Sequence, residues 1–436
     1  MKLVPFPILV SAFLVLFASG PAGAGSSGHR LLPDFTKLEN LRPVGIPPMV
    51  WEILKPSNQV STIDRPQTRL EDRAAGSLLG LAIGDALGVT HEIFEPNQVT
   101  RQREFLRTEP IGMMMGNGPW VRGGLILEPG EFTDDTSMAL CLADSMLKLG
   151  KQTNPFNGAG TLAFGQDLML RFYCWSKGDC NAPRHSLDSH SNRLMGHSWG
   201  IGGNTRSALH RFAMSEFLNP WVGGRDPHQD AGNGAIMRMA PAALYWSDHR
   251  DLAMGMARVQ ARLTHHVPEA EDAAAYMASV IVRSLQGNLS KELVFSPQGV
   301  QIHHEEIFSV VSRSLDEWKV IPESEIQTLP GRTLWTLEAA LWCIHTTDTF
   351  RDAVLKALSL GGDADTVAAV TGQLAGAFYG KQAIPMDWLD ALKFKSQIEK
   401  RAIALVRRLP FTKDLLLTYG YQPGPKGPGD QGHGGQ

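Results

Sequence analysis

Two segments of the chain, far apart in the sequence, place carboxylate and hydroxyl side chains directly in front of an apolar run with helical spacing. The first is FTDDTSMALCLADSML, residues 132–147, and the second is GGDADTVAAVTGQLAGAFYG, residues 361–380. Such side chains can cap a helix, neutralise a cation or exchange protons with a substrate. The six oxygen-bearing residues at these helix starts are Thr133, Asp134, Asp135, Asp363, Asp365 and Thr366.

Helix capping explains only part of this pattern. A single Asp or Thr before a helix accepts a hydrogen bond from a free backbone N–H, and the helix dipole favours its negative charge. Two carboxylates at each of two helices exceed that need. If the four carboxylates met at one point they would repel one another unless a cation or strong donors neutralised them. Spacing along the chain does not tell whether they meet, so the surrounding elements have to be considered.

Almost every periodic segment between residues 68 and 410 has helical spacing. Apolar residues recur at helical intervals in segments 69–88, 135–149, 161–175, 204–217, 234–247, 251–263, 269–286, 333–346, 350–360, 366–379 and 386–408. Strand signals are scarce and do not alternate with helices, which disfavours a doubly wound sheet. The sequence therefore predicts one large all-α domain over residues 68–410, with long functional loops between its helices.

The segment 69–88 carries a glycine at every fourth position along one face. These glycines lower its intrinsic helix propensity by about 1 kcal/mol each relative to alanine. A row of glycines also lets the backbone of another helix approach closely. Because the flanks are charged, we expect a tightly packed central helix of a bundle and no membrane span. The four glycines are Gly76, Gly80, Gly84 and Gly88.

The composition is that of an ordinary globular protein. Of 436 residues, 43% are apolar and 19% charged, and 44 acidic against 41 basic side chains leave a formal net charge of −3. A nucleic-acid-binding protein is expected to carry a basic surface. The sequence therefore predicts no nucleic-acid partner.

Residues 1–24 have the pattern of a secretory signal peptide. Lys2 supplies a short positive region, residues 4–18 form the apolar segment, and Ala22, Gly23 and Ala24 match a small-residue cleavage site. A membrane anchor is the alternative, but the apolar run is short for a span and prolines interrupt it. We expect an exported protein with no span after cleavage; without a functional signal it would be cytoplasmic.

Two further segments lie outside the predicted domain, and the cysteines are few. Residues 25–67 read as a Pro-rich extension, and residues 411–436 as a Gly/Pro-rich tail without stable structure. Among the four cysteines, Cys174 and Cys180 flank a short loop and could form a disulfide bridge in an exported protein. No cysteine has zinc-ligand spacing.

A set of motifs, in this order along the chain, resembles the ADP-ribosylglycohydrolase family. They are GSLLGLAIGDALGVTHE (76–92), FTDDTSMAL (132–140), GIGGNTRSAL (200–209), GNGAIMRMAPAAL (232–244), RLTHHVPEAEDAAA (262–275), SLGGDADTVAAVTGQLAGAFYG (359–380) and IPMDWL (384–389). The resemblance covers about 68–410 and includes the dinitrogenase-reductase-activating glycohydrolase and ADP-ribosyl-acceptor hydrolases. It implies a single large orthogonal helical bundle with a dinuclear metal cleft.

The resemblance also implies the roles of the acidic motifs. Two divalent cations, Mg²⁺ or Mn²⁺, would be held where the two helix starts face each other. Oxygen ligands without Cys or His suit these cations and argue against zinc or copper. The implied metal ligands are Thr133, Asp134, Asp135, Asp363, Asp365 and Thr366.

Other positions match the catalytic and substrate-binding residues of the family. Glu92 matches a glutamate that several members need for catalysis, although without the resemblance it would read as a solvated loop acid. Glycine-rich loops near the distal ribose and pyrophosphate would offer backbone N–H groups to an anion. Asp230 and Ala231 stand where some relatives carry other contacts, which leaves the fit to the ADP half open. The implied substrate-binding residues are Gly203, Asn204, Gly232, Asn233, Gly234 and His265.

The function that follows is hydrolysis of the glycosidic bond between ADP-ribose and a modified protein side chain, by an enzyme expected to be a monomer. Arginine is the more frequent acceptor in the family and serine is another; the sequence does not decide between them. Three alternatives remain. These are hydrolysis of a free ADP-ribose derivative, immunity against an ADP-ribosylating toxin, and a non-enzymatic binding role on the same fold.

Overall fold

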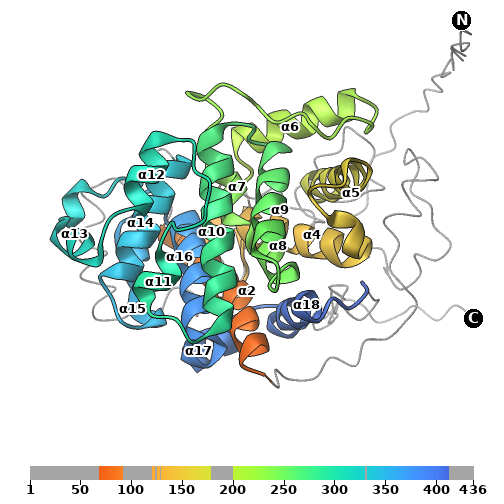
Figure 1. The fold of residues 1–436 in the computed structure, drawn as a ribbon. Helices are drawn as coiled ribbons and strands as arrows, with labels where there is room; N and C mark the ends of the chain where they lie inside the picture. Colours follow the sequence, from red (N-terminus) through yellow and green to blue (C-terminus); the bar gives the residue numbers. More distant parts are fainter. Residues whose placement is uncertain are drawn as a thin grey trace, which may run out of the picture. The chain divides into compact units, whose positions relative to one another are not determined.

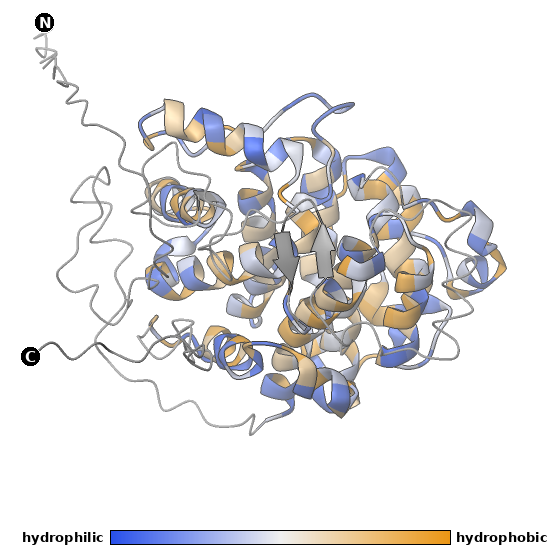
Figure 2. Ribbon diagram, turned by 180° about the vertical axis from the view of Figure 1, so that it is seen from behind, coloured by the Kyte–Doolittle hydropathy of each residue, from blue (hydrophilic) through white to orange (hydrophobic). Residues whose placement is uncertain are grey.

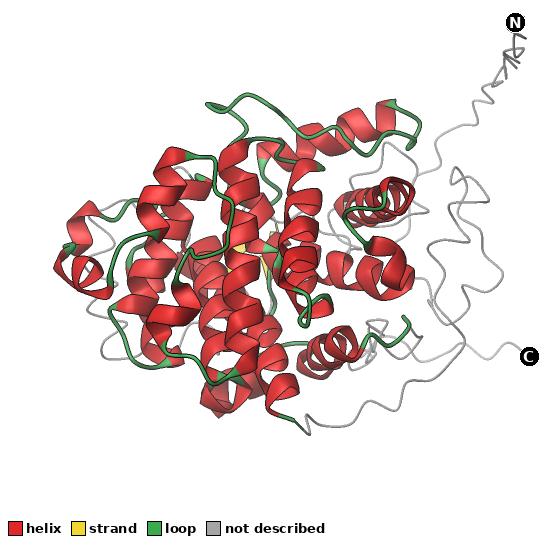
Figure 3. Ribbon diagram, viewed as in Figure 1, coloured by secondary structure: helices red, strands yellow, loops and turns green. Residues whose placement is uncertain are grey.

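The structure is a computed structural model that describes residues 68–91, 120–122, 125–127, 129–177, 200–328 and 331–411. All of these residues belong to one compact unit of the chain. Within them the elements are helices apart from one short hairpin, which confirms the predicted all-α class (Figures 1 and 3). The described helices include none with the length and apolar character needed to cross a membrane.

The α-helices follow one another along the chain with short connections in the C-terminal half. They are α2 (Arg69–Gly88), α4 (Asp134–Leu149), α5 (Gly158–Lys177), α6 (Gly203–Met214), α7 (Gly234–Met237), α8 (Ala240–Tyr245), α9 (Arg250–Arg262), α10 (Pro268–Gln286), α11 (Lys291–Phe295), α12 (Glu305–Val311), α13 (Leu315–Val320), α14 (Thr333–His345), α15 (Phe350–Ser359), α16 (Ala364–Tyr379), α17 (Met386–Ala391) and α18 (Lys395–Arg407). The 3₁₀ helices are η2 (Val89–His91), η3 (Gly150–Thr153), η4 (Glu323–Glu325) and η5 (Lys381–Ala383).

The hairpin is formed by β1 (Trp120–Arg122) and β2 (Leu125–Leu127). Its strands pair antiparallel, with Trp120 opposite Leu127 and Arg122 opposite Leu125. No alternating pattern predicts these strands, because each is only three residues long.

The centre of the fold is an antiparallel pair formed by α2 and α16. A Cβ atom on Gly80 would lie 2.3 Å from the carbonyl oxygen of Gly372, and one on Gly76 would lie 2.3 Å from that of Gly376. Only glycine allows the two backbones to come this close. The predicted packing role of the glycine row is therefore confirmed. At the far end Gly88 packs against the Cα of Asp365, so the pair ends at the second acidic motif.

The other helices surround this pair. Every residue of α2 from Ala74 to Gly88 is buried, as is every residue of α16 from Ala364 to Ala377. The surrounding helices carry both hydrophobic and hydrophilic residues along their length (Figure 2), the pattern of helices with one face toward a core. The acidic motifs at the ends of α2 and α16 thus rest on the most deeply packed part of the fold.

Two predicted helices are each broken in two. The segment 234–247 divides into α7 and α8, and Pro241 lies in the first turn of α8, where its missing N–H removes no helical hydrogen bond. The segment 386–408 divides into α17 and α18 at Phe394, whose φ of 57° is left-handed.

The second break supports the loop that leads into the first acidic motif. The backbone N–H of Lys393 donates to the carbonyl oxygen of Gly130 at 2.9 Å. The ring of Phe394 meets that of Phe132 edge to face, with 6.4 Å between centroids. The C-terminal helices therefore hold the residues just before Thr133 in place.

Candidate active site

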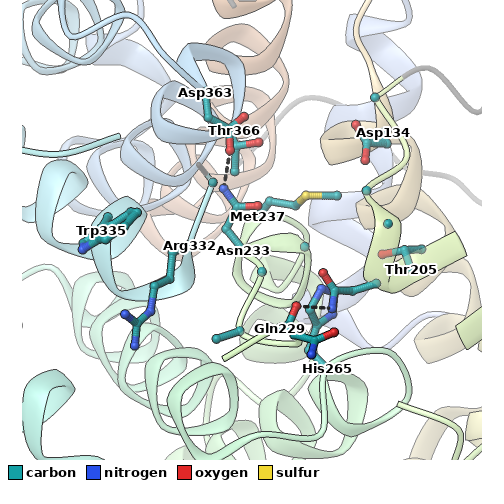
Figure 4. A pocket seen from close by; sticks show the side chains of 18 of the residues that line it. Asp134, Thr205, Gln229, Asn233, Met237, His265, Arg332, Trp335, Asp363 and Thr366 are labelled. Carbon is teal, nitrogen blue, oxygen red and sulfur yellow. Dashed lines mark hydrogen bonds between the residues drawn. The ribbon is translucent and has the colours of Figure 1, made fainter. Parts of the chain in front are cut away.

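A cavity of about 630 Å³ opens where the acidic motifs meet the glycine-rich loops, within the usual size range of small-molecule sites. Figure 4 shows Asp363 and Thr366 on one side of it and Asp134 across from them, with Met237 between. Its lining residues are Asp134, Gly200, Gly202, Gly203, Asn204, Thr205, His228, Gln229, Ala231, Gly232, Asn233, Gly234, Met237, His265, Gly331, Arg332, Trp335, Asp363, Asp365 and Thr366.

The two acidic motifs come together in space. One carboxylate oxygen each from Asp85, Asp135 and Asp365 lies within 4.8 Å of the other two. Four of the six predicted metal ligands line the cavity itself. Thr133 and Asp135 lie behind this wall, where the Thr133 hydroxyl is 3.5 Å from Asp135 Oδ2. The sequence pattern thus corresponds to one cluster of oxygen atoms.

Asp85 positions the first motif, and the sequence analysis did not single it out. Its Oδ1 accepts hydrogen bonds from the backbone N–H and the hydroxyl of Thr133, at 2.9 and 2.7 Å. Its Oδ2 accepts the same pair of bonds from Thr136, at 2.9 and 2.6 Å. Asp85 therefore caps the N-terminus of α4 from α2. Because four donors occupy its two oxygens, we assign Asp85 to positioning, although it also lies within reach of a cation. A lone carboxylate inside the apolar segment 74–88 was the available signal.

Asp135 is the residue whose environment most clearly calls for a cation. It is fully buried, and its Oδ1 has no hydrogen-bond partner among the residues that the structure describes. Burial first, and then the charges of Asp85, Asp134 and Asp363, hold the pKa of the Asp135 carboxyl well above its usual range. Like charges confined in a buried space are tolerated only when something neutralises them. The oxygen-only donor set fits a divalent cation.

Two glycines in left-handed conformations cover the carboxylates on opposite sides of the cavity. Gly200 has a φ of 78°, and a Cβ there would lie 2.1 Å from Asp134 Oδ1. Gly331 has a φ of 76°, and a Cβ there would lie 2.7 Å from Asp363 Oδ2. Both the conformation and the close approach require glycine. Neither was predicted as a site residue, because a single glycine in a loop carries no such signal.

The side-chain amides of two predicted substrate-binding residues donate hydrogen bonds to other residues of the protein. The Asn233 amide donates to Asp363 Oδ2 at 2.5 Å and to the Thr336 hydroxyl at 2.9 Å. The Asn204 amide donates to Asp230 Oδ1 at 2.7 Å. Both residues line the cavity, as do Gly203, Gly232 and Gly234. Asn233 therefore fixes the orientation of an acidic residue, whatever else it contacts.

His265 lines the cavity, as predicted, and is only 2% exposed. Burial, together with the charge of Arg238, lowers the pKa of His265 to about 3, so the ring is neutral near pH 7. Arg332 and Trp335 also line the cavity but were not predicted. The Arg332 guanidinium is held by Glu269, to which its Nη2 donates at 2.7 Å.

Two predictions involve residues that the structure does not describe: the catalytic residue and the disulfide partner of Cys174. Glu92, the predicted catalytic residue, lies outside the described residues. Cys174 is disulfide-bonded, whereas its predicted partner Cys180 also lies outside them. Cys141 and Cys343 are free and buried.

Comparison with known proteins identifies the family. The sequence profile described as ADP-ribosylglycohydrolase matches residues 66–414, which include both acidic motifs and every lining residue of the cavity. The chain belongs to the ADP-ribosylglycohydrolase family. The family name describes hydrolysis of a glycosidic bond to ADP-ribose, and the acidic cavity is the candidate active site of such an enzyme.

Similar ADP-ribosylglycohydrolases have been named by function. The ADP-ribosylarginine hydrolase Tri1 of Pseudomonas putida (strain GB-1) is 35% identical over 350 residues, covering 80% of this chain and 82% of that protein. Tri1 of Serratia proteamaculans (strain 568) is 33% identical over 345 residues, covering 79% and 82%. The ADP-ribosyl-[dinitrogen reductase] glycohydrolase of Rhodospirillum rubrum is 31% identical over 337 residues, covering 76% and 94%.

A solved structure agrees with this placement. The structure titled ADP-ribosylglycohydrolase-related protein complex superposes with a TM-score of 0.57 at 35% sequence identity, covering 78% of this chain and 99% of that chain. The predicted bundle of the ADP-ribosylglycohydrolase type is therefore confirmed, and its acidic cluster can hold a divalent cation.

Proposed function

We propose that this enzyme hydrolyses the N-glycosidic bond between ADP-ribose and an arginine side chain of a modified protein. The observation that carries the reaction is the cavity in which both acidic motifs meet beside glycine-rich loops. The preference for arginine rests on two relatives, 33% and 35% identical, that are named as ADP-ribosylarginine hydrolases. A serine linkage is the runner-up.

The cofactor in this proposal is a pair of Mg²⁺ or Mn²⁺ ions. Bound ions would supply Lewis-acid stabilisation of charge and fix the ribose that carries the scissile bond. The residues proposed to hold them are Thr133, Asp134, Asp135, Asp363, Asp365 and Thr366. The chain's own contribution is orientation: Asp85 fixes the start of α4, and Asn233 fixes Asp363. The glycine-rich loops offer backbone N–H groups to the ADP moiety.

Proton transfer in this proposal belongs to Glu92. A carboxylate beside the scissile bond can act as general acid or base in glycoside hydrolysis. The proposal rests on the place of Glu92 at the end of the motif that begins at Gly76. If Glu92 has another role, Asp134, Asp135 and Asp363 are the carboxylates to test next.

The reaction is tested with defined linkages. The purified chain would be incubated with arginine-linked and serine-linked ADP-ribosyl peptides, with Mg²⁺ or Mn²⁺, and released ADP-ribose measured. We expect release from the arginine-linked peptide, and none after EDTA or with the Asp365→Asn variant. Release from the serine-linked peptide alone would contradict the acceptor, and release from neither peptide would contradict the function.

We also propose that residues 1–24 direct export and that the mature enzyme is a monomer. The support is the signal-peptide pattern, together with the disulfide bond at Cys174, which suits an oxidising compartment. The mature protein from its native host would begin at or near Gly25. An intact Met1 terminus in a soluble cytoplasmic pool would refute the proposal.

A further inference from the structure

A chain of three polar side chains runs from the core beneath the cavity to the cavity wall. Arg238 is fully buried, and its Nη2 donates a hydrogen bond to Thr264 Oγ1 at 2.6 Å. Thr264 Oγ1 lies in turn 2.7 Å from Nδ1 of His265. His265 is the member that reaches the cavity.

Several contacts hold Arg238, the first side chain of the series, in place. Because Arg238 can only donate, the hydrogen bonds run in a fixed direction from the core to the cavity. Arg238 Nε donates to Gln260 Oε1 at 3.0 Å, and its Nη2 donates to the Gln260 carbonyl oxygen at 3.2 Å. The guanidinium lies over the ring of Phe172, 4.8 Å from its centroid. A guanidinium can only donate. Thr264 Oγ1 is therefore an acceptor in its bond with Arg238.

The hydroxyl hydrogen of Thr264 then has one destination. Among the described residues, the only acceptor within hydrogen-bond distance of this hydroxyl is Nδ1 of His265. If Nδ1 carried the ring proton instead, the buried hydroxyl hydrogen would be left without a partner, which is unfavourable in a protein interior. Nδ1 is thus the acceptor. In a neutral ring the proton must then be on Nε2.

Nε2 lies at the cavity wall between two glycines. A Cβ on Gly232 or on Gly234 would each lie 3.3 Å from this nitrogen, so both glycines leave it the space it occupies. Nε2 has no hydrogen-bond partner among the described residues, although the residue is only 2% exposed. Figure 4 shows His265 on the same side of the cavity as Gln229, away from Asp363. A donor that lines the cavity without a protein partner is suited to an acceptor that arrives with a ligand.

We propose that Arg238 and Thr264 are positioning residues that lock His265 in its Nε2–H tautomer, so that the cavity presents a permanent donor to an acceptor oxygen of the ligand. The nature of that ligand rests on the proposed function: in ADP-ribose the oxygen belongs to a phosphate or a ribose. A donor fixed in this way accepts from no substrate hydroxyl, and therefore selects ligands that place a lone pair at this point.

The lock is tested first in the unaltered protein, without ligand. Long-range ¹H–¹⁵N correlation spectra of histidine-labelled protein at pH 7.5 distinguish the two tautomers by which ring nitrogen carries the proton, and His265→Gln assigns the signals. We expect a single Nε2–H species for His265. A proton on Nδ1, or a mixture of tautomers, overturns the proposal whether or not the protein hydrolyses any substrate.

Two matched variants test what the lock does for binding. Thr264→Val removes the hydroxyl at nearly constant shape, and Thr264→Ser retains it. In folded proteins we expect Thr264→Val to weaken ADP-ribose binding by about tenfold and to show tautomer exchange at His265. Thr264→Ser should stay within about threefold of wild type and keep the Nε2–H signal.

The possible results distinguish a failure of the tautomer proposal from a failure of the proposed function. A folded Thr264→Val protein that binds ADP-ribose like wild type overturns the role of the lock in recognition. If wild type itself does not bind ADP-ribose, the proposed function fails, and the spectra of the free protein still decide the tautomer.

Discussion

Two buried aspartates at the candidate active site differ in what their neighbours leave available. Asp85 and Asp135 both belong to the buried acidic cluster. Four donors satisfy the oxygens of Asp85, whereas Oδ1 of Asp135 has no hydrogen-bond partner within the described ranges. The same residue type thus serves as a helix cap in one case and as a buried carboxyl group with an unpaired oxygen, available to a cation, in the other.

An Asp→Asn substitution should act differently inside the acidic cluster, which contains Asp365, and at an exposed aspartate outside it. Asp365→Asn removes a charge that a divalent cation needs, so we expect loss of activity and at least tenfold weaker Mn²⁺ binding. Calorimetric titration with Mn²⁺ measures the binding, and circular dichroism checks the fold. Asp390→Asn, at an exposed ion pair on α17, is the matched control and should bind Mn²⁺ normally. Wild-type Mn²⁺ affinity in Asp365→Asn would exclude this aspartate as a ligand.

Substitution of Glu92 tests whether this residue transfers a proton during hydrolysis, independently of cation binding. We expect Glu92→Gln to preserve the fold, because glutamine has nearly the size of glutamate. Turnover should fall by roughly 10²-fold or more, the usual scale for losing a general acid or base. Mn²⁺ and ADP-ribose binding should change little. Turnover equal to wild type would show that another carboxylate transfers the proton.

The site could be predicted from sequence only as far as residue type carried the information. Six oxygen side chains at two helix starts were recognisable; Asp135 and Asp365 meet in the acidic cluster, and four of the six line the cavity. Gly200 and Gly331 were not recognisable, because their importance comes from carboxylates that approach from distant segments. The positioning role of Asn233 likewise depends on Asp363, a contact across 130 positions of the chain.

At the level of elements, the close pairing of α2 with α16 determines where both motifs lie. Gly80→Ala would place a Cβ 2.3 Å from the Gly372 carbonyl oxygen, so the helices must separate. We expect a loss of about 3 kcal/mol in the free energy of unfolding, together with weaker Mn²⁺ binding. Urea titration followed by circular dichroism measures the free energy of unfolding.

Gly158→Ala is the matched control for this substitution. A Cβ there would meet nothing within 4 Å, and alanine is the better helix former by about 1 kcal/mol. Stability should stay equal or rise. Equal stability of Gly80→Ala and wild type would mean that the pair tolerates a wider spacing.

Long elements were predicted well and short or interrupted ones poorly, for a physical reason. Helix 69–88 has the same limits in the structure, because its periodic pattern is long and its cap at Thr68 is standard. Helices α11, α12 and α13 have five, seven and six residues, too few turns to produce a periodic pattern. The break at Phe394 depends on its contact with Phe132, which no local pattern contains.

At the scale of the whole molecule, a histidine far from the cavity links stability to pH. His345 packs against the rings of Trp318 and Phe295, and its Nδ1 is buried with no hydrogen-bond partner in the described part of the chain. Burial is the main cause that lowers the pKa of His345 to about 3; the positive charge of Lys291 lowers it further, and the negative charge of Glu292 partly opposes this. Above pH 6.5 the ring is neutral in both the folded and the unfolded chain. Below pH 6.5 only the unfolded chain takes up the proton, so stability falls.

This linkage gives a measurable expectation. Between pH 7.5 and 5.5 His345 should contribute a loss of about 1.4 kcal/mol in the free energy of unfolding. His345→Phe keeps an aromatic ring. Its free energy of unfolding should fall by about 1.4 kcal/mol less than that of wild type over the same pH range, as measured by urea titration at both pH values. His210→Phe, at an exposed position on α6, should behave like wild type. An unchanged pH dependence in His345→Phe would assign the acid sensitivity to other groups.

The central helix pair also sets the order in which this protein can be made. Ser77 of α2 donates to the carbonyl oxygen of Gln373 in α16, a partner 296 positions later in the chain. During synthesis α2 therefore leaves the ribosome long before α16, which buries it. The apolar faces of α2 stay exposed until most of the chain has been made. Contacts this distant slow folding and leave apolar segments open to aggregation in the meantime. A nascent chain stopped before residue 364 cannot form the α2–α16 pair and lacks the second acidic motif, so synthesis must pass that point before the chain can hold a complete metal site.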